Sequence, residues 1–443
     1  MVKRIRLIVL FLCVAVLFVS CGKEPSLTTA ISALDADQLD HLHHLPAYDS
    51  PYTIGYERND GTYALYIFSS PIQYASGNGY AVIDNTVIAS DTEFAYENAA
   101  NSIKSYFPQT LSDQFVLANA NETMKFSLQG DTGKFSKAKS TTYLSMYGDS
   151  VSAVAYKSSA MDMFFYPTQS GIKSEIVLKK KPAQNSISFF VTTSASSFEN
   201  NRNGYILFKT GDEIDCMVNA PITKDSGTNS PNYTTECWMD VAPQEGGYLV
   251  SIEIPQMFLD DAQTVFPICL DPSFELRQEK TPDSTVYSQI DINNYLRPYA
   301  VIGKHPLLGE GWHFTRLKVN WLFSCPSDNV ISASYHCPPL FPADTASPVS
   351  LFRAETQWFS SMVSWNNKPS PADKIAESSN GVYDVTSFVK TCLGDVTCET
   401  ESIGFLSQLP GDGYEIIPTS ENTLYAPYVV VILKQEPTFL GRP

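Results

Sequence analysis

The chain has 443 residues, of which 12% are aromatic, together with 28 prolines and a formal net charge of −17. This length allows two or three domains, each with a sizeable hydrophobic core. The negative charge argues against nucleic acid as a partner, because a phosphate backbone is bound by basic groups that displace its counterions. Few long amphipathic helical patterns occur, so the composition indicates a mostly β protein.

The first twenty residues have the pattern of a secretory leader. Lys3, Arg4 and Arg6 form a positively charged start, and an apolar run follows from residue 8 to residue 19. The sequence Leu-Phe-Val-Ser-Cys at its end resembles the lipobox of bacterial lipoproteins, in which Cys21 is diacylated and becomes the new N-terminus. An ordinary signal peptide or a short membrane anchor is the alternative. We therefore expect residues 1–20 to be a lipoprotein signal peptide and the mature chain to be lipid-anchored, extracytoplasmic and held in the bacterial cell envelope.

Residues 21–50 are polar and lack sustained periodicity, so we interpret them as a tether. The histidines at positions 41, 43 and 44 are its one chemical peculiarity. A metal site is one interpretation of such a cluster. A solvated linker is the favoured one, because no cysteine stands at ligand spacing.

Strand patterns dominate from Tyr56 onward. Asn59-Asp60-Gly61 predicts a hairpin turn that precedes a strand from Thr62 to Phe68. Apolar side chains alternate in the segments 187–193 and 248–254, as they do in half-buried strands. Further strands are expected at residues 124–128, 152–156, 176–180 and 205–208. The pattern predicts a β-sandwich region over residues 51–273, formed by one sandwich or by two small ones.

The C-terminal part is organised around Trp358 and Trp365, seven residues apart. Asn366, Asn367 and Pro369 follow, and the proline cannot continue a central strand, so the segment is expected to form a strand, a turn and a loop.

This segment resembles the DNRLRE domain, a β-sandwich module of bacterial surface proteins, some members of which belong to a carbohydrate-binding family. The resemblance is carried by a W-N-N-x-P motif, a D-V-T motif and matching strands before and after them: Asp283, Tyr287, Arg316, Leu317, Ile331, Ala333, Ser364, Trp365, Asn366, Asn367, Pro369, Asp384, Val385, Thr386, Gly404, Phe405, Pro427, Val429 and Val431. It covers residues 274–434 and implies a jelly-roll β-sandwich that folds as a unit, followed by a tail at 435–443. The expected fold class is therefore all-β, with an N-terminal sandwich region before this module.

The region before the module resembles the N-terminal part of Rhs/YD-repeat and wall-associated bacterial proteins. The matching residues keep their order across some two hundred positions: Asp60-Gly61-Thr62-Tyr63, Ser70-Pro71-Ile72, Ile83-Asp84-Asn85-Thr86, Tyr96, Asn98, Phe107-Pro108, Gly171, Lys173, Glu175 and the residues from Phe266 to Pro272. No tyrosine-aspartate repeats follow in this sequence, so the resemblance does not carry over a toxin-delivery function.

The sequence contains no nucleophile elbow, no H-E-x-x-H helix, no Walker loop and no dinucleotide glycine fingerprint. His313, near Arg316 and Tyr335, is the one arrangement that could imitate the base of a polysaccharide lyase. Acid pairs such as Asp260 with Asp261, and Glu399 with Glu401, would serve glycoside hydrolysis only if they faced each other about 5 to 10 Å apart. No catalytic residue is therefore assigned.

Aromatic rings are the other candidate chemistry, because sugars stack their C–H faces on flat rings. Trp312 lies between glycines and a histidine, which predicts an exposed loop and a stacking ring, whereas Trp358 and Trp365 are expected in or near the core. Arg316 and Lys318 stand two apart on one expected strand, so they can form a basic patch on one face. Asp384 is expected to cap a short helix rather than to bind calcium.

Nine cysteines are present, and seven of them follow the lipobox. An odd number leaves at least one thiol free or paired between chains. Cys392 and Cys398 would close a short loop and are the predicted disulfide. The absence of a C-x-x-C spacing argues against a structural zinc site.

The sequence predicts a non-enzymatic cell-surface lipoprotein with a carbohydrate-binding-like module that binds a glycan or another surface polymer. A structural or protein-interaction module on the same anchor is the second hypothesis. A polysaccharide lyase or hydrolase is the third, and it requires a cleft in which histidine, tyrosine, arginine or carboxylate groups converge. No cofactor is expected, apart from calcium if the glycan is acidic.

Membrane attachment is predicted to depend on Cys21, because this cysteine follows a small residue after the apolar run. Cys21→Ala should release the protein from membranes or block its processing. Metabolic labelling with a fatty acid measures the effect, and unchanged acylation of the variant would contradict the lipoprotein assignment.

Overall fold

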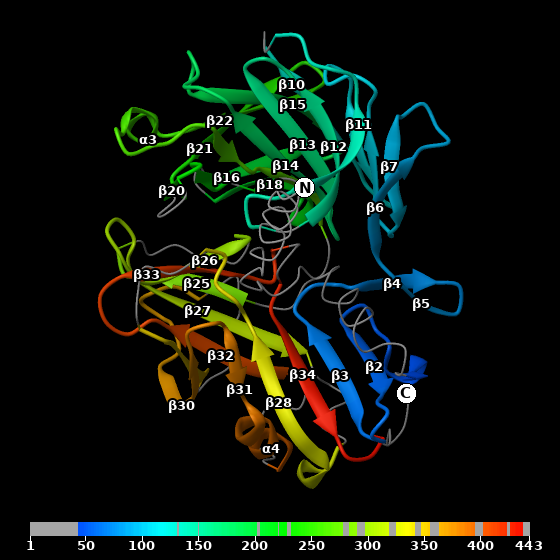
Figure 1. Cartoon of the computed structure of the whole chain (residues 1–443), viewed down its shortest axis with the longest axis vertical. Coiled ribbons are helices and arrows are strands. Elements are labelled where there is room, and N and C mark those ends of the chain that lie inside the picture. Colours follow the sequence, from blue (N-terminus) through cyan, green and yellow to red (C-terminus); the bar gives the residue numbers. More distant parts are fainter. Residues whose placement is uncertain are drawn as a thin grey trace, which may run out of the picture.

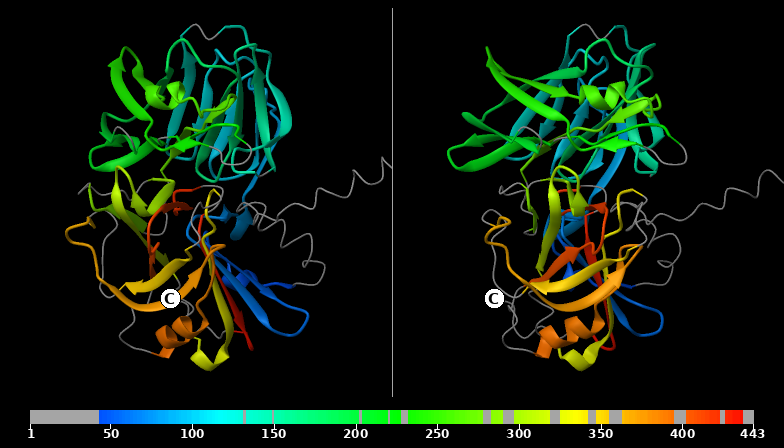
Figure 2. Two further views of the ribbon diagram at one scale, coloured as in Figure 1. Left: turned by 60° about the vertical axis from the view of Figure 1, so that its left-hand side comes forward. Right: turned by 90° about the vertical axis from the view of Figure 1, so that its left-hand side faces the viewer.

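The computed structural model describes residues 43–130, 133–148, 150–201, 204–219, 221–227, 232–277, 283–289, 297–318, 325–341, 347–354, 363–394, 402–422 and 426–436. These residues form two β-sandwiches, one above the other in Figure 1 and in both views of Figure 2, which confirms the predicted all-β fold. In this part of the chain no helix combines the length and apolar character needed to span a membrane.

One sandwich, which we call the inserted sandwich, uses the middle of the chain. Its first sheet has the order β21 (Trp238–Gln244), β22 (Gly247–Glu253), β15 (Ser186–Thr193), β10 (Thr123–Gln129), β9 (Phe115–Ala118), β8 (Lys104–Phe107), β7 (Tyr96–Ala100) and β6 (Asp84–Ala89). Its second sheet has the order β11 (Lys139–Leu144), β12 (Ser150–Lys157), β13 (Met161–Pro167), β14 (Gly171–Leu178), β24 (Ser273–Leu276), β18 (Glu213–Asn219), β17 (Tyr205–Thr210) and β16 (Ser197–Asn201). The short strands β19 (Thr223–Lys224), β20 (Tyr233–Thr234) and β23 (Ile268–Leu270) extend the second sheet, and the helix α3 spans Gln256–Asp260.

Aromatic rings from both sheets fill the inserted sandwich. Phe126 of β10 stacks on Phe274 of β24 with ring centroids 3.8 Å apart. Phe115 of β9 lies 4.3 Å from Phe165 of β13. Phe189 of β15 is fully buried in the same cluster, as the alternation in that strand predicted. Contacts between aromatic rings across two sheets therefore hold these layers together.

The other sandwich, which we call the terminal sandwich, is built from both ends of the described chain. Its first sheet has the order β1 (His43–His44), β2 (Thr53–Glu57), β3 (Tyr63–Phe68), β34 (Tyr428–Leu433), β28 (Val330–His336) and β31 (Val382–Asp384). Its second sheet has the order β30 (Pro371–Ser378), β29 (Val349–Ala354), β32 (Ser402–Gln408), β27 (Gly309–Lys318), β26 (Tyr299–His305) and β33 (Tyr414–Pro418), with β25 (Asp283–Tyr287) paired to β27. The helix α4 (Thr386–Gly394) and the 3-10 turns Pro46–Tyr48 and Ser327–Asn329 complete it, and the hairpin β4 (Gln73–Ser76) and β5 (Gly79–Val82) lies between the two sandwiches in the chain.

Strand pairing crosses the predicted domain boundaries. β3 pairs with β34 along six residues, from Tyr63 opposite Leu433 to Phe68 opposite Tyr428. Residues 53–68, predicted to belong to the region 51–273, therefore lie in one sheet with the C-terminal strands. β24, at residues 273–276, pairs with β14 and β18 of the inserted sandwich instead. A fragment that begins at residue 274 would leave one edge of β34 without its partner.

The end of the predicted tether is also part of the fold. β1 pairs with β2, and Tyr48 is buried in the terminal sandwich beside Leu65. His44 Nε2 lies 2.9 Å from Asp49 Oδ1. The predicted tether 21–50 is therefore wrong for residues 43–50, whereas residues 21–42 lie outside the described residues.

The predicted hairpin is confirmed between β2 and β3. Arg58 N–H donates to Thr62 O at 2.7 Å, and Gly61 has φ +74°. A left-handed backbone of this kind favours glycine, which explains the Asn-Asp-Gly sequence.

The two sandwiches share a third hydrophobic cluster. Tyr147 and Tyr166 come from the inserted sandwich, whereas Tyr287, Val301 and Ile416 come from the terminal one. All five side chains are buried, so the junction is a packed interface.

Leu65→Ala tests whether β3 belongs to the core of the terminal sandwich. Leu65 is fully buried between the sheets, so its truncation should lower the free energy of unfolding by about 2–5 kcal/mol. Equilibrium urea unfolding measures this. The matched control is Ile331→Ala on β28, whose side chain is 42% exposed and whose loss should cost less than about 0.5 kcal/mol. Equal effects of the two substitutions would contradict the packing.

Candidate functional site

Trp312 lies within strand β27 and not on the predicted loop. Its glycine neighbours have other roles. Gly309 has φ +73° where the chain enters β27. A Cβ atom on Gly311 would lie 2.2 Å from the carbonyl oxygen of Val301 on β26. These glycines therefore permit a turn and a close approach of two strands, and they do not mark a loop.

The W-N-N-x-P motif forms a turn that covers the outer face of β27. The Asn367 side chain accepts a hydrogen bond from Ser364 N–H at 2.6 Å, and Asn367 N–H donates to Ser364 O at 3.3 Å. Val363, just before the turn, is buried against Phe314. The asparagine thus fixes the turn that presents Trp365 to β27.

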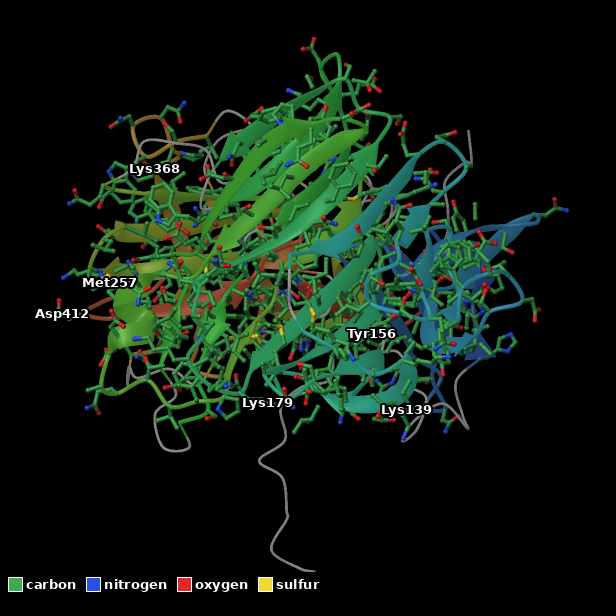
Figure 3. The ribbon with its side chains drawn as sticks, turned by 90° about the horizontal axis from the view of Figure 1, so that it is seen from above. Lys139, Tyr156, Lys179, Met257, Lys368 and Asp412 are labelled. Atoms are coloured by element: carbon green, nitrogen blue, oxygen red, sulfur yellow. The ribbon has the colours of Figure 1, made fainter. Side chains whose placement is uncertain are left out.

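Trp312 and Trp365 form an edge-to-face pair with ring centroids 5.3 Å apart and planes at 61°. Lys368 Nζ lies 3.6 Å from the centroid of Trp365 and 4.6 Å from that of Trp312. Trp312 Nε1 donates to Glu310 Oε1 at 2.8 Å. We call these four residues the tryptophan cluster. Figure 3 places Lys368 toward the periphery of the molecule.

Both rings of the tryptophan cluster are partly buried, because they pack on Val286, Phe314 and Leu406. Burial lowers the pKa of the Lys368 ammonium, and the Glu310 carboxylate opposes that shift. The ammonium donates to the Trp365 carbonyl at 2.9 Å and lies over both rings, a cation–π arrangement. Part of each ring is therefore already in contact with protein, and the remaining exposed part is what a sugar could contact.

The predicted core position of Trp365 is therefore only partly right. The side chain packs on a small satellite cluster at the surface of the sheet and not between the two sheets. Trp358 lies outside the described residues, so its predicted core position stays a prediction.

Arg316 is on β27, two residues beyond the buried Phe314, and its side chain is partly buried. Lys318 ends the same strand, and its side chain lies outside the described part. Strand alternation puts the Arg316 side chain on the same face of β27 as Trp312, and the predicted basic patch of Arg316 and Lys318 stays a prediction.

His313 is a core residue of the terminal sandwich. Its ring is fully buried, with Nδ1 3.1 Å from Thr285 Oγ1 and Nε2 2.9 Å from Thr315 Oγ1. Burial lowers its pKa to about 3, so the ring is neutral at physiological pH. A substrate cannot reach this histidine, which removes the lyase-like arrangement of His313, Arg316 and Tyr335.

The carboxylate of Asp384 accepts a hydrogen bond from Thr386 N–H at 2.9 Å, at the first residue of α4. Hydrogen bonds from the side chain and the N–H of Thr386 lower the pKa of Asp384. The carboxylate thus forms a turn at the start of α4, one residue before the N-cap position that was predicted for it. Across the described residues, no group of three or more His, Cys, Asp or Glu side chains is arranged to hold a metal ion.

The lipidation and disulfide predictions depend on undescribed residues. Cys21 and Cys398 both lie outside the described residues. Cys392 is buried in α4. The Cys392–Cys398 bond therefore stays a prediction. Glu399 and Glu401, one of the predicted acid pairs, lie outside the described residues. In the other pair, Asp260 is hydrogen-bonded to Lys181 and Gln256.

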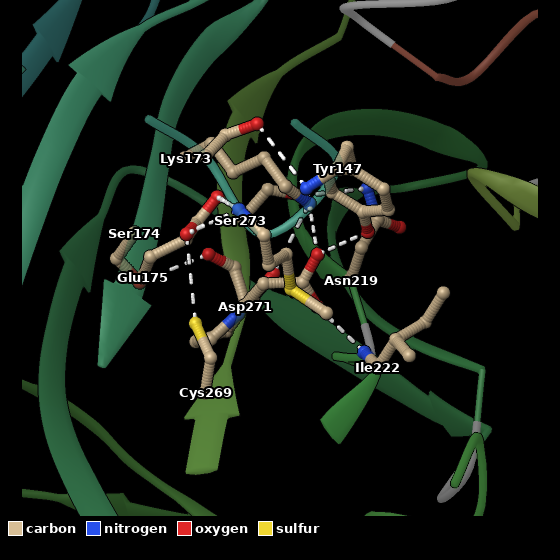
Figure 4. A network of polar contacts seen from close by, with 12 residues as sticks. Tyr147, Lys173, Ser174, Glu175, Asn219, Ile222, Cys269, Asp271 and Ser273 are labelled. Atoms are coloured by element: carbon tan, nitrogen blue, oxygen red, sulfur yellow. Dashed lines mark hydrogen bonds and ion pairs between the residues drawn. The ribbon is translucent and has the colours of Figure 1, made fainter. Parts of the chain in front are cut away.

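Sequence reasoning missed a buried polar network in the inserted sandwich near the junction (Figure 4). Its centre is Glu175 on β14, which is fully buried. Tyr143 and Tyr166 donate their hydroxyls to its carboxylate at 2.7 and 2.9 Å, and Met146 N–H donates at 2.9 Å. Burial raises the pKa of Glu175 to about 7, although the tyrosine hydroxyls favour the charged form.

Asp271 is the second acid of this network. Lys173 Nζ lies 2.8 Å from its Oδ2, and Ile222 N–H donates to its Oδ1 at 2.6 Å. The Tyr147 hydroxyl also donates to Asp271. Both acids are sealed from solvent and surrounded by donors, so the network organises the strands and does not meet a substrate. The signal in the sequence was a charged residue within the apolar strand pattern of β14.

No known protein family matches the chain, and no curated protein is significantly similar to it.

The stability of the protein should fall with rising pH through Glu175. The pKa of the folded state, about 7, lies above the ordinary value of 4.5, so the folded form binds the proton more tightly. The stabilisation is complete below pH 4.5 and is lost as the pH rises through 7. It corresponds to about 3 kcal/mol in the free energy of unfolding.

Urea unfolding of the wild type and of Glu175→Gln across this range measures the effect. The difference between the two free energies should change by about 3 kcal/mol. The exposed Glu245→Gln, in the turn between β21 and β22, is the control and should give a flat difference. A flat difference for Glu175→Gln as well would refute the raised pKa.

Proposed function

We propose that the chain is a lipid-anchored protein of the bacterial cell envelope that binds a neutral glycan through the tryptophan cluster. The observation that carries this proposal is the pair of partly exposed rings, Trp312 and Trp365, at the outer face of the terminal sandwich. Sugars stack on such rings through their C–H faces. Glu310 supplies carboxylate oxygens and Lys368 an ammonium beside the rings, and both groups can bond to sugar hydroxyls.

The overall charge favours a neutral ligand. With a formal net charge of −17, the protein repels a polyanion unless a local basic patch or bound calcium offsets the field. Lys368 lies over the rings beside Glu310, and Arg316 is on β27 with Trp312. The electrostatic potential near the rings is therefore less negative than the net charge of the protein alone would give. An acidic glycan should therefore bind only with calcium or at low salt.

The cellular location rests on the lipobox-like sequence that ends at Cys21. The β-sandwich fold and the resemblance to the DNRLRE domain support a surface role, because this module is found in bacterial surface proteins. A structural or protein-interaction module on the same anchor would not require exposed aromatic rings, so the partly exposed Trp312 and Trp365 favour the glycan-binding hypothesis. A lyase or hydrolase would need accessible catalytic groups, and His313 is not accessible.

Trp312→Ala should weaken the binding of a neutral glycan about tenfold, which is about 1.4 kcal/mol, because it removes one stacking ring and the edge contact of the other. A panel of neutral polysaccharides, followed for both retention and cleavage, first identifies the ligand. Isothermal calorimetry on the mature chain then measures the affinity of the wild type and the variant.

Trp238→Ala is the matched control, because Trp238 lies on β21 of the inserted sandwich with its side chain 49% exposed. Its affinity should equal that of the wild type. Alginate, a polyuronate, serves as the negatively charged ligand and should bind only with calcium or at low salt. Tight alginate binding that resists chelator and salt and survives Trp312→Ala would overturn the proposal, and so would cleavage of any polymer in the panel.

A further inference from the structure

A cleft of about 250 Å³ lies where the two sandwiches meet and shares no residue with the tryptophan cluster. The inserted sandwich contributes β20, the segment after it and α3. The terminal sandwich contributes the turn between β26 and β27 and the start of β33. In Figure 1 these elements face each other on one side of the molecule, and Figure 3 shows Met257 of α3 and Asp412 before β33 at the same edge.

Aromatic rings form one wall of this cleft. Tyr414 packs edge-to-face on His305 with centroids 4.5 Å apart, and Tyr233 approaches Tyr414 at 6.5 Å. Tyr233 in turn stacks on Phe341 at 5.1 Å in the buried junction. The rings are therefore fixed from behind by the packed interface, and they need not reorganise to meet a ligand.

His305 presents a hydrogen-bond donor in the cleft. Its Nδ1 accepts the N–H groups of Leu307 and Leu308, both at 3.3 Å. Burial lowers the pKa of the ring, so the neutral form dominates at neutral pH. Because Nδ1 is an acceptor in this form, the proton resides on Nε2, which has no partner among the described residues.

The cleft is acidic. Glu236 lines it, is partly buried, and has a carboxylate without a hydrogen-bond or ion-pair partner in the described chain. Asp261 lines it too and uses one oxygen to accept Gln263 N–H at 2.8 Å. Among the described residues that form the lining, none is a lysine or an arginine. A half-buried carboxylate without a partner favours a cation beside it.

We propose that this cleft binds a single amino-sugar unit, with the sugar ring against Tyr233 and Tyr414 and its ammonium group at Glu236. The His305 Nε2–H group donates to a sugar hydroxyl, and Asp261 accepts from another. Electron-rich rings attract an ammonium group through their faces, and the carboxylate adds a charge-assisted hydrogen bond.

The dimensions of the cleft favour a small unit. A volume of about 250 Å³ lies below the roughly 300–1,000 Å³ typical of sites that enclose drug-sized ligands. The exposed Met257 and Leu307 at its rim can contact the neighbouring units of a longer polymer. The site is separate from the tryptophan cluster, so either proposal can fail without the other.

Calorimetry with a glucosamine trisaccharide and its N-acetylated counterpart tests the proposal at near-neutral pH. The two probes share a sugar backbone, and acetylation removes the charge. The amino form should bind the mature chain at least tenfold more tightly, and added salt should reduce this preference. Glu236→Gln should abolish the preference while it leaves the affinity for the acetylated form within about twofold. Tyr414→Ala should weaken both ligands.

A control variant and a stability measurement separate this site from other effects. Glu213→Gln removes one exposed charge on β18, and its preference for the amino form should equal that of the wild type. An unchanged melting temperature of Glu236→Gln shows that the fold is intact. Equal affinity for the two trisaccharides, a preference that survives Glu236→Gln, or equally tight binding of a blocked lysine amide would overturn the assignment.

Discussion

The pairing of β3 with β34 is the constraint on which the rest of the structure depends. It joins residues 63–68 to residues 428–433, so one sheet contains both ends of the described chain. Everything between β3 and β25 must therefore leave the terminal sandwich and return to it. The inserted sandwich is formed by this intervening part of the chain, and the shared hydrophobic cluster around Tyr147 and Tyr287 packs the two sandwiches against each other. The chain passes between the two sandwiches twice, before β6 and after β24, and the cleft lies at the interface that these connections and the shared cluster hold together.

The same interface explains why acidic groups are buried beside it. Glu175 lies in β14 and Asp271 in the link between β23 and β24, and each accepts several hydrogen bonds. A buried acid without such donors would cost far more than it contributes. The donors come from segments far apart in the chain, such as Tyr143, Lys173 and Ile222. The network therefore specifies how these segments meet. Its unfavourable part is the burial of the Glu175 carboxyl group, which opposes the charged form.

The strands could be predicted from the sequence because alternation is local. Phe189 and Val250 are buried as their patterns indicated, and the Asn-Asp-Gly turn joins β2 to β3. The β3–β34 partnership could not be predicted, since no local pattern identifies a partner hundreds of residues away. The predicted loop around Trp312 was wrong for another reason. Gly311 is a glycine because the neighbouring strand β26 approaches its backbone closely, and not because the chain forms a loop there. The turn at Asn367 was visible in the sequence, but the contact of Lys368 with two rings depends on how that turn docks.

The hairpin β26–β27 connects the two proposed sites physically. His305 ends β26 opposite Gly309, and Trp312 follows three residues later on β27. At a rise of about 3.4 Å per residue, Gly309 and Trp312 are separated by about 10 Å along the strand, and this odd spacing puts the side chains of His305 and Trp312 on opposite faces of the sheet. Because β27 also pairs with β25 and β32, the hairpin cannot shift one site without the other. Its two ends differ in charge, with Lys368 over Trp312 and Glu236 facing the cleft of His305. The outer face of β27 therefore has Lys368 and Glu310 of opposite charge beside Trp312, whereas the cleft beside His305 is lined by acids without a lysine or an arginine among its described residues.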